Sequence, residues 1–367
     1  MSKLRVAIIF GGKSTEHQVS LQSAKNIINE LDRTKFDLCL IGINEQGQWH
    51  EYSETDYLLN SDNPKTISLS KPLRAVAIIP GSVKGQFISL EDGQTLPQID
   101  VVFPIVHGAY GEDGTLQGLL HMIDMPYVGP NIMSSAACMD KDITKRLLDG
   151  AGLAVAPFIT IMAHQINDIP YNEMVRQLGL PLFIKPANLG SSVGISKVNN
   201  EEEFNAALKM AFEYDLKVIV ESAIVGREIE CAVLGNEAPE VSPCGEIVLN
   251  DAFYAYNTKY IDDDGAKVVV PAVMDENTSL HIRQVALKAY RVLNCLGMAR
   301  VDVFLTQDNR VVINEINTLP GFTNISMYPK LWQSAGLGYQ SLITKLIELA
   351  LDHHRKTAVQ KQSVSFN

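Results

Sequence analysis

The sequence predicts a mixed α/β fold whose N-terminal part is an open sheet covered by helices. Short apolar runs of strand length recur there with helical stretches between them; they span residues 4–10, 38–43, 75–79 and 101–106. Apolar side chains then recur with helical spacing over residues 21–31. With 367 residues, 46% of them hydrophobic, the chain is long enough for two or three domains with cores of their own.

A hairpin in the last third of the chain carries the strongest chemical signal. Two apolar, β-branched runs flank Asp308-Asn309, which we expect to be a two-residue turn. This register places Asp302 opposite Glu315. It also places Arg300 opposite Asn317, and the strand period of two puts all four side chains on one face. Facing carboxylates repel, and oxygen ligands suit magnesium or manganese, so the hairpin predicts one or two such ions held against a triphosphate. A solvated, charged face is the alternative.

Composition limits the possible partners. A formal net charge of -11 argues against nucleic acid or an anionic membrane surface, because both attract basic faces. The five cysteines are widely spaced with no C-x-x-C pair, so we expect small core residues and neither a disulfide framework nor a zinc site. No apolar stretch has the length of a signal-peptide core or a membrane span, which predicts a cytoplasmic protein.

Polar residues follow the ends of two predicted strands. After the first strand and its glycine turn, Glu16 and His17 lie where a helix begins, a place that can receive a carboxylate or a phosphate. His107 and Glu112 directly follow the strand that ends at residue 106. Ligands of open α/β sheets bind at the carboxyl ends of strands, so these residues are candidates for a site. The alternatives are that Glu16 and His17 cap the helix or lie on the surface, and that His107 has a structural role.

A glycine- and serine-rich turn follows a strand that carries Lys185. Residues 190–194, GSSVG, have small side chains and free amides that can fold over a phosphate. They also match the G-x-S-x-G elbow of serine hydrolases, with Ser192 as the nucleophile. In an elbow the strand runs directly into the first glycine, whereas residues 186–189 intervene here. The hydrolase is therefore the alternative from another class.

A long polar segment with four aromatic residues spans 250–265. Loops of this length are functional or disordered, and the aromatic residues favour a lid over disorder.

Seven blocks occur in a fixed order: FGGKSTEHQVS, HGAYGEDGTLQG, AACMDK, FIKPANLGSSVG, NTKY, ARVDVF and EINTLPGFTNISMYP. With these blocks the chain resembles the ATP-grasp ligases, and among them the D-alanine:D-alanine ligase family. The resemblance covers nearly the whole chain and implies a Rossmann-like N-terminal domain followed by a two-subdomain ATP-grasp fold. The implied division is 1–140, 141–225 and 226–355, with the lid at 250–265 and a flexible tail at 356–367.

The resemblance also implies roles for individual residues. It places magnesium or manganese, as two ions, on Asp302, Glu315 and Asn317. It places ATP on seven residues: Lys141, Lys185, Glu221, Glu228, Phe253, Tyr254 and Lys259. Glu16 would bind the ammonium group of the first D-alanine in a hydrogen-bonded group with Ser191 and Tyr260, and His107 and Arg300 would lie near the reacting groups. Gly321, Ser326 and Met327 would line the site of the second D-alanine.

The activity implied is the ATP-dependent joining of two D-alanines through a D-alanyl phosphate, giving ADP and phosphate, for peptidoglycan precursor synthesis. A ligase that uses D-lactate or D-serine as the second substrate is the alternative within the family. The implied partners are small molecules and, in a homodimer, a second copy of the chain. Some relatives carry lysine where this chain has Ser222, so a side-chain contact to the adenine is not expected there.

Overall fold

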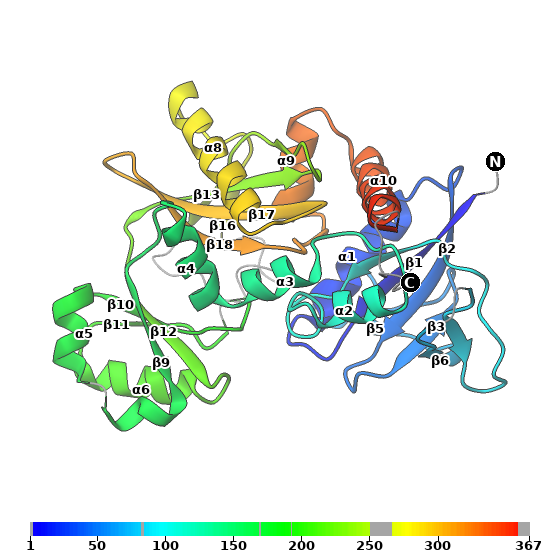
Figure 1. Ribbon diagram of the computed structural model, residues 1–367, viewed down its shortest axis with the longest axis horizontal. Helices are drawn as coiled ribbons and strands as arrows, with labels where there is room; N and C mark the ends of the chain where they lie inside the picture. The colour runs from blue at the N-terminus through cyan, green and yellow to red at the C-terminus, as the bar shows by residue number, and fades with distance from the viewer. Residues whose placement is uncertain (1–2, 82–83, 169, 192, 250–265, 359–367) are drawn as a thin grey trace, which may run out of the picture.

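The computed structural model describes residues 3–81, 84–168, 170–191, 193–249 and 266–358 (Figure 1). Within these ranges the chain forms an N-terminal domain, a four-stranded unit and a larger unit on a six-stranded sheet. None of the helices in these ranges is both long and apolar enough to cross a membrane.

The N-terminal domain is built on a six-stranded sheet in the order β7-β6-β3-β2-β1-β8. The four predicted strands are confirmed, and β1 pairs in parallel with both β2 and β8. The outer strands pair antiparallel and were not all predicted. The elements are β1 (Leu4–Gly11), α1 (His17–Glu30), β2 (Phe36–Ile43), β3 (Trp49–Tyr52), β4 (Leu58–Leu59), β5 (Ser68–Leu69), β6 (Arg74–Ile78), β7 (Phe87–Ser89), β8 (Val101–Ile105), α2 (Thr115–Met122) and α3 (Ile132–Met139).

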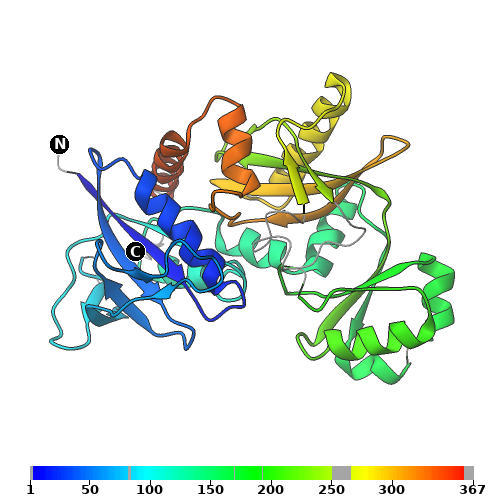
Figure 2. The ribbon, with the colours of Figure 1, turned by 180° about the vertical axis from the view of Figure 1, so that it is seen from behind.

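The four-stranded unit has the antiparallel order β11-β10-β12-β9 and a core of its own, centred on Phe204. Figures 1 and 2 show it at the end of the molecule away from the N-terminal domain. Its elements, with the helix that leads into it, are α4 (Lys141–Gly150), β9 (Phe158–Met162), the 3-10 helix η1 (Ala163–Asp168), α5 (Tyr171–Leu178), β10 (Leu182–Pro186), β11 (Ser196–Val198), α6 (Glu201–Ala211) and β12 (Lys217–Ser222).

The larger unit has the strand order β16-β15-β13-β17-β18, with β14 also paired to β13. Helices α8 and α9 pack against opposite faces of this sheet, because α8 clusters with Cys231 and Val233 of β13 and α9 with the alternate residues Ala232 and Leu234 (Figures 1 and 2). Its elements are β13 (Gly226–Leu234), β14 (Glu240–Val241), β15 (Gly245–Leu249), β16 (Ala266–Val269), α8 (Glu276–Val292), β17 (Met298–Thr306), β18 (Val311–Asn317), α9 (Met327–Ser334) and α10 (Tyr339–Ala358).

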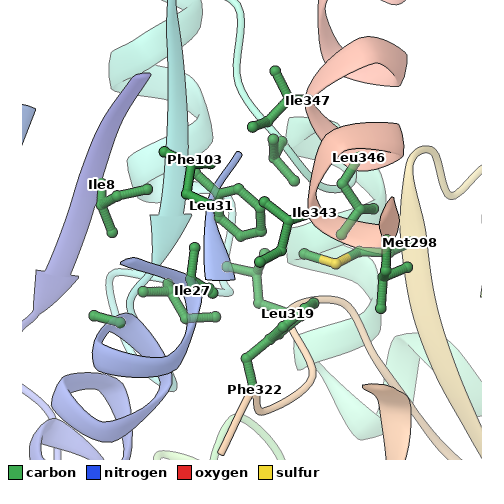
Figure 3. Packing of buried hydrophobic residues seen from close by; sticks show 14 of the residues in the cluster. Ile8, Ile27, Leu31, Phe103, Met298, Leu319, Phe322, Ile343, Leu346 and Ile347 are labelled. Carbon is green, nitrogen blue, oxygen red and sulfur yellow. The ribbon is translucent and has the colours of Figure 1, made fainter. Parts of the chain in front are cut away.

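One core joins the N-terminal domain to the larger unit. Figure 3 shows side chains of the N-terminal sheet and α1 packed against α10 and against residues that follow β18. Leu319 and Phe322 belong to this core and are almost completely buried. The segment after β18 is therefore fixed to the N-terminal domain by apolar packing.

The expected two-residue turn of the β17–β18 hairpin is wrong. Thr306 donates from its amide to the carbonyl of Arg310, and the first pairs after the turn lie one residue out of the predicted register. A β-bulge between Asp302 and Val303 restores that register, because Asn314 is an extra residue on β18. Helix α10 also continues to Ala358, past the expected start of the flexible tail.

Candidate active site

Three neighbouring strands bring three carboxylates into one row. The predicted pair Asp302 and Glu315 is confirmed by the register of β17 with β18. On the other side of β17, Glu230 of β13 faces Asp302. We call these three residues the acid row. Sequence reasoning missed Glu230, although its spacing of two from Glu228 on a predicted strand placed both on one face.

Arg300 contacts two members of the acid row. Its guanidinium donates from Nε to Oδ1 of Asp302 and from Nη2 to Oδ2, both at 2.7 Å. Its Nε also lies 2.9 Å from Oε2 of Glu230. Asn317 donates from Nδ2 to Asp302 at 2.9 Å, so the predicted opposition of Arg300 and Asn317 on this face is confirmed as well.

The acid row fits a hard divalent cation. Among the described residues, no group of three His, Cys, Asp or Glu side chains converges closely enough to hold a metal ion alone. The expected ligands Asp302, Glu315 and Asn317 include only two such side chains, so an ion there would need further oxygen ligands. Magnesium characteristically keeps waters and binds substrate phosphates beside one or two carboxylates. The residues present therefore fit magnesium or manganese shared with a phosphate chain.

A second charged cluster lies on the four-stranded unit and the helix that precedes it. Glu221 of β12 sits between Lys145 and Lys185, with Nζ of Lys145 3.0 Å from its Oε2 and Lys185 paired to Oε1. All three side chains are buried or nearly so. We call them the lysine cluster. Lys145 was missed, although it lies one helical turn after the predicted Lys141.

The charges of the lysine cluster depend on each other. Burial alone would raise the pKa of Glu221, but the two ammonium groups lower it to about 2. Burial lowers the pKa of Lys145, while Glu221 and, from the acid row, Glu315 oppose that shift. The effect of Glu315 on Lys145 shows that the two clusters are close enough to interact.

A pocket opens beside the hairpin where the three units meet. It is lined by residues of all three regions, among them Glu112, Lys141, Gly190, Glu315 and Asn317. Lys141 donates from Nζ to the carbonyl of Leu189, which holds this side chain against the 190–194 turn. Predicted ATP-binding and metal-binding residues thus line one pocket. Glu228 lies on the same strand face as Glu230.

Glu16 and Ser191 meet across 175 positions of sequence. Ser191 donates from Oγ to the Glu16 carboxylate, which is almost fully buried. Ser191 has a φ of 52°, a left-handed conformation that is costly for a residue other than glycine and recurs at functional sites. A Cβ at Gly108 would lie 2.6 Å from Oε2 of Glu16, and one at Gly190 would lie 3.2 Å away. Both glycines allow the backbone to close around this carboxylate.

His107 and Glu112 are brought next to this pair. Burial lowers the pKa of His107 to about 4, helped by the charge of Arg300 and opposed by a hydrogen bond to Leu319. Burial, together with the charge of Glu16, raises the pKa of Glu112 to about 8, although the amides of Gly108 and Leu319 donate to its carboxylate. At neutral pH the imidazole is therefore uncharged.

The three residues expected around the second substrate have different environments. A Cβ at Gly321 would lie 2.8 Å from Oγ of Ser326, so these two residues face each other closely. Ser326 also accepts from the amide of Thr323 at 2.9 Å. Met327 is buried, and its sulfur fills the space that a side chain at Gly245 would occupy. Met327 is therefore packed against β15.

Other predicted residues lie outside the described ranges. These are Ser192 and four residues of the expected lid, Phe253, Tyr254, Lys259 and Tyr260. All five cysteines are buried with free thiols, which confirms the expectation that they are core residues.

Family models of known proteins match most of the chain. The model described as "D-ala D-ala ligase N-terminus" matches residues 5–130, and the model described as "D-ala D-ala ligase C-terminus" matches residues 147–348. The chain belongs to the D-alanine–D-alanine ligase family.

Individual family members match over their full length. The D-alanine–D-alanine ligase of Proteus mirabilis is 89% identical over 98% of this chain and 99% of its own. D-alanine–D-alanine ligase A of Escherichia coli K12 is 61% identical, over 96% and 97%. Among solved structures, the D-alanine-D-alanine ligase of Coxiella burnetii is 39% identical with a TM-score of 0.83, covering 98% and 97%. The VanG D-Ala:D-Ser ligase of Enterococcus faecalis is 38% identical with a TM-score of 0.84, covering 95% and 100%.

Membership of this ligase family contradicts the serine hydrolase alternative. The fold agrees, because β10 ends at Pro186 and does not run into Gly190 as a nucleophile elbow requires. The neighbouring Ser191 donates its hydroxyl proton to a carboxylate from the N-terminal domain. The G-x-S-x-G pattern arises here from a turn that approaches Glu16.

Proposed function

We propose that this protein joins two molecules of D-alanine into D-alanyl-D-alanine, with conversion of ATP to ADP and phosphate, as a step of peptidoglycan precursor synthesis. The observation that carries the proposal is the proximity of a cationic cluster, an acidic row and the Glu16–Ser191 pair in a chain of this ligase family. Glu315 of the acid row and Gly190, next to the Glu16–Ser191 pair, line one pocket, and the charge of Glu315 acts on Lys145 of the lysine cluster. Each of these three groups matches a different part of the reaction.

ATP would be held between the lysine cluster and the hairpin. Lys141, Lys185, Glu221 and Glu228 are the ATP-binding residues proposed in the described ranges, with Phe253, Tyr254 and Lys259 from the expected lid. Two buried ammonium groups against one carboxylate leave an excess of positive charge, which favours a phosphate chain. Asp302, Glu315 and Asn317 would hold magnesium or manganese, which supplies charge neutralisation at the β- and γ-phosphates when bound.

The first D-alanine would enter with its ammonium group on Glu16. A buried carboxylate attracts that cation, and Ser191 and the proposed partner Tyr260 would fix its direction. The substrate carboxylate is then free to attack the γ-phosphate, giving D-alanyl phosphate and ADP. Arg300 can stabilise the charge on the transferring phosphoryl group, because a guanidinium donates to two oxygens at once.

The second D-alanine would bind beside Gly321 and Ser326. Its amine attacks the acyl carbon, the new C–N bond forms, and phosphate leaves. His107 is neutral and buried, and its two ring nitrogens bind the Leu319 carbonyl and Ser23, so it would support the backbone near the reacting groups without adding a charge. An acyl phosphate is hydrolysed in water, which gives the expected lid over 250–265 a function in excluding solvent.

The nature of the second substrate is the point on which related enzymes differ. One structural neighbour is a D-Ala:D-Ser ligase at 38% identity, whereas relatives at 89% and 61% identity are D-alanine–D-alanine ligases. The higher identity supports D-alanine. D-serine or D-lactate as the second substrate is the remaining alternative.

Product analysis tests the proposal. The protein is incubated with ATP, magnesium and either D-alanine or L-alanine, and phosphate and dipeptide are measured together. We expect one dipeptide for each phosphate released with D-alanine, and neither product with L-alanine. Mixtures of D-alanine with D-serine or D-lactate should still give mainly D-alanyl-D-alanine. Phosphate release without dipeptide, or ester hydrolysis without ATP, would contradict the proposal.

The proposal also has a location and an assembly state. A reaction that consumes ATP is expected in the cytoplasm, where ATP is available, and we propose a homodimer as the assembly. Light scattering coupled to gel filtration distinguishes a dimer from a monomer of 40.4 kDa.

A further inference from the structure

The turn from Leu319 to Phe322 is held at both ends. Its terminal side chains are buried in the core shared with the N-terminal domain (Figure 3). The Phe322 ring meets Phe103 of β8 edge-on, with 6.0 Å between ring centroids. Gly321 lies inside this turn and faces Ser326. The turn therefore carries backbone of the proposed second-substrate site on anchors from another domain.

Every backbone group at the two ends of the turn has a side-chain partner. Glu112 accepts from the amide of Leu319 at 3.2 Å, and Nδ1 of His107 lies 3.1 Å from the Leu319 carbonyl. The amide of Phe322 donates to Oγ of Ser23 at 3.1 Å. Its carbonyl accepts from Nδ2 of Asn26 at 2.9 Å and from the Tyr339 hydroxyl. Except for the tyrosine, these partners come from the N-terminal domain.

The donor and the acceptor of each hydrogen bond among these groups can be assigned. A carbonyl only accepts, so the proton of neutral His107 must be on Nδ1, and Nε2 must accept. Oγ of Ser23 lies 3.2 Å from that Nε2 and therefore donates to it. The same oxygen accepts from the amide of Phe322. Ser23 thus links the imidazole to the far end of the turn.

We propose that Ser23 is a positioning residue for the second amino-acid substrate. Ser23 is completely buried, so it acts through the turn and through His107 and does not touch substrate. Its hydroxyl fixes the distance between the imidazole and the amide of Phe322, and so the placement of Gly321 between them. This inference rests on the proposed function, and it adds a residue of α1 that selects the geometry of the amine-donating site.

Loss of the hydroxyl should affect one substrate site more than the other. Ser23→Ala leaves the Phe322 amide and Nε2 of His107 buried without this partner, which favours a shift of the turn. Glu16 and the lysine cluster do not depend on this contact. We therefore expect weaker binding of the second D-alanine, with unchanged binding of ATP and the first.

Hydroxylamine separates the two sites. It replaces the second amine: its nitrogen bonds to the acyl carbon of D-alanyl phosphate, phosphate leaves, and D-alanine hydroxamate forms. Hydroxamate formation reports ATP and the first D-alanine, whereas dipeptide formation requires both. In Ser23→Ala we expect the KM of the second D-alanine to rise roughly tenfold, the loss of one well-placed hydrogen bond. The constants for hydroxamate formation should stay within about twofold.

Ser20→Ala is the matched control. Ser20 is equally buried on α1, but its Oγ binds the amide of Gly11 and the carbonyl of Ile105, away from the turn. The Ser20→Ala protein should lose a similar amount of folding stability without the selective rise in the KM of the second D-alanine. Asn26→Ala is a second variant at a less buried anchor of the same turn and should raise the same KM.

The outcomes separate the two proposals. Equal effects on both sites, the same selective effect in Ser20→Ala, or an unchanged KM in both Ser23→Ala and Asn26→Ala would overturn the role of Ser23. A wild-type protein that forms neither hydroxamate nor dipeptide would overturn the proposed function itself.

Discussion

The lysine cluster and the acid row are neighbouring groups of charged residues, but their balance of charge is opposite. The lysine cluster places two ammonium groups around one buried carboxylate. The acid row places three carboxylates along neighbouring strands beside one guanidinium. The first has an excess of positive charge and the second an excess of negative charge. The two neighbouring clusters therefore favour a bound anion and a cation next to it.

The two clusters also differ in what their internal pairs do. Glu221 stabilises the folded state, because without it two ammonium groups would remain buried together. Glu315 faces another carboxylate, so without a cation it adds repulsion. Removing one negative charge should therefore destabilise the lysine cluster and reduce the repulsion in the acid row.

The largest effect is expected for Glu221→Gln in the lysine cluster. The substitution keeps the shape but leaves Lys145 and Lys185 uncompensated, and breaking a buried ion pair in this way costs about 3–5 kcal/mol. Urea unfolding at neutral pH measures the loss. Glu173→Gln is the control, because Glu173 makes an exposed pair with Arg176 and its loss should be nearly neutral.

The pH dependence of this effect identifies its cause. The folded-state pKa of Glu221 is lowered from 4.5 to about 2, so its stabilisation is complete above pH 4.5 and is lost as the pH falls through about 2. The difference between wild type and Glu221→Gln should therefore narrow as the pH falls over that range. A difference that does not change with pH would assign the loss to packing and not to charge.

Glu315→Gln tests the acid row. The proposed site loses a metal ligand, so dipeptide synthesis at a fixed magnesium concentration should fall by about a hundredfold. Stability without metal should rise by up to about 1 kcal/mol, because one facing carboxylate is gone. Asp308→Asn, in the exposed turn of the same hairpin, should keep wild-type activity. Full activity with unchanged magnesium dependence in Glu315→Gln would mean that the row is a structural face.

The acid row shows what local sequence patterns can predict. A strand period and a hairpin are short-range properties, so the opposition of Asp302 and Glu315 followed from the sequence. The turn was nevertheless wrong by one residue, and only the bulge at Asn314 cancelled that error. Glu230 was missed because the neighbour of β17 on its other side is set by sheet order, which the sequence pattern alone does not determine.

The remaining contacts of the site are long-range. Glu16 and Ser191 meet because two units of the fold close on each other, and no periodicity connects residues 175 positions apart. The family resemblance, not the pattern, supplied that pair. Ser23 had neither signal, since a buried serine on an amphipathic helix has the same pattern as a small core residue.

The smallest expected effect is that of magnesium on the stability of the free protein. A cation that binds the folded acid row stabilises it by mass action, by about 1.4 kcal/mol at ten times its dissociation constant. Thermal unfolding with and without magnesium, in the absence of nucleotide, should therefore show a modest rise in Tm for wild type. Glu315→Gln should lose that rise, and Glu221→Gln should keep it because its acid row is intact. If both variants keep the rise, the ion binds elsewhere, and the contrast between a cation-binding row and an anion-binding cluster fails. If neither keeps it, the two clusters act as one electrostatic unit, as the influence of Glu315 on Lys145 allows.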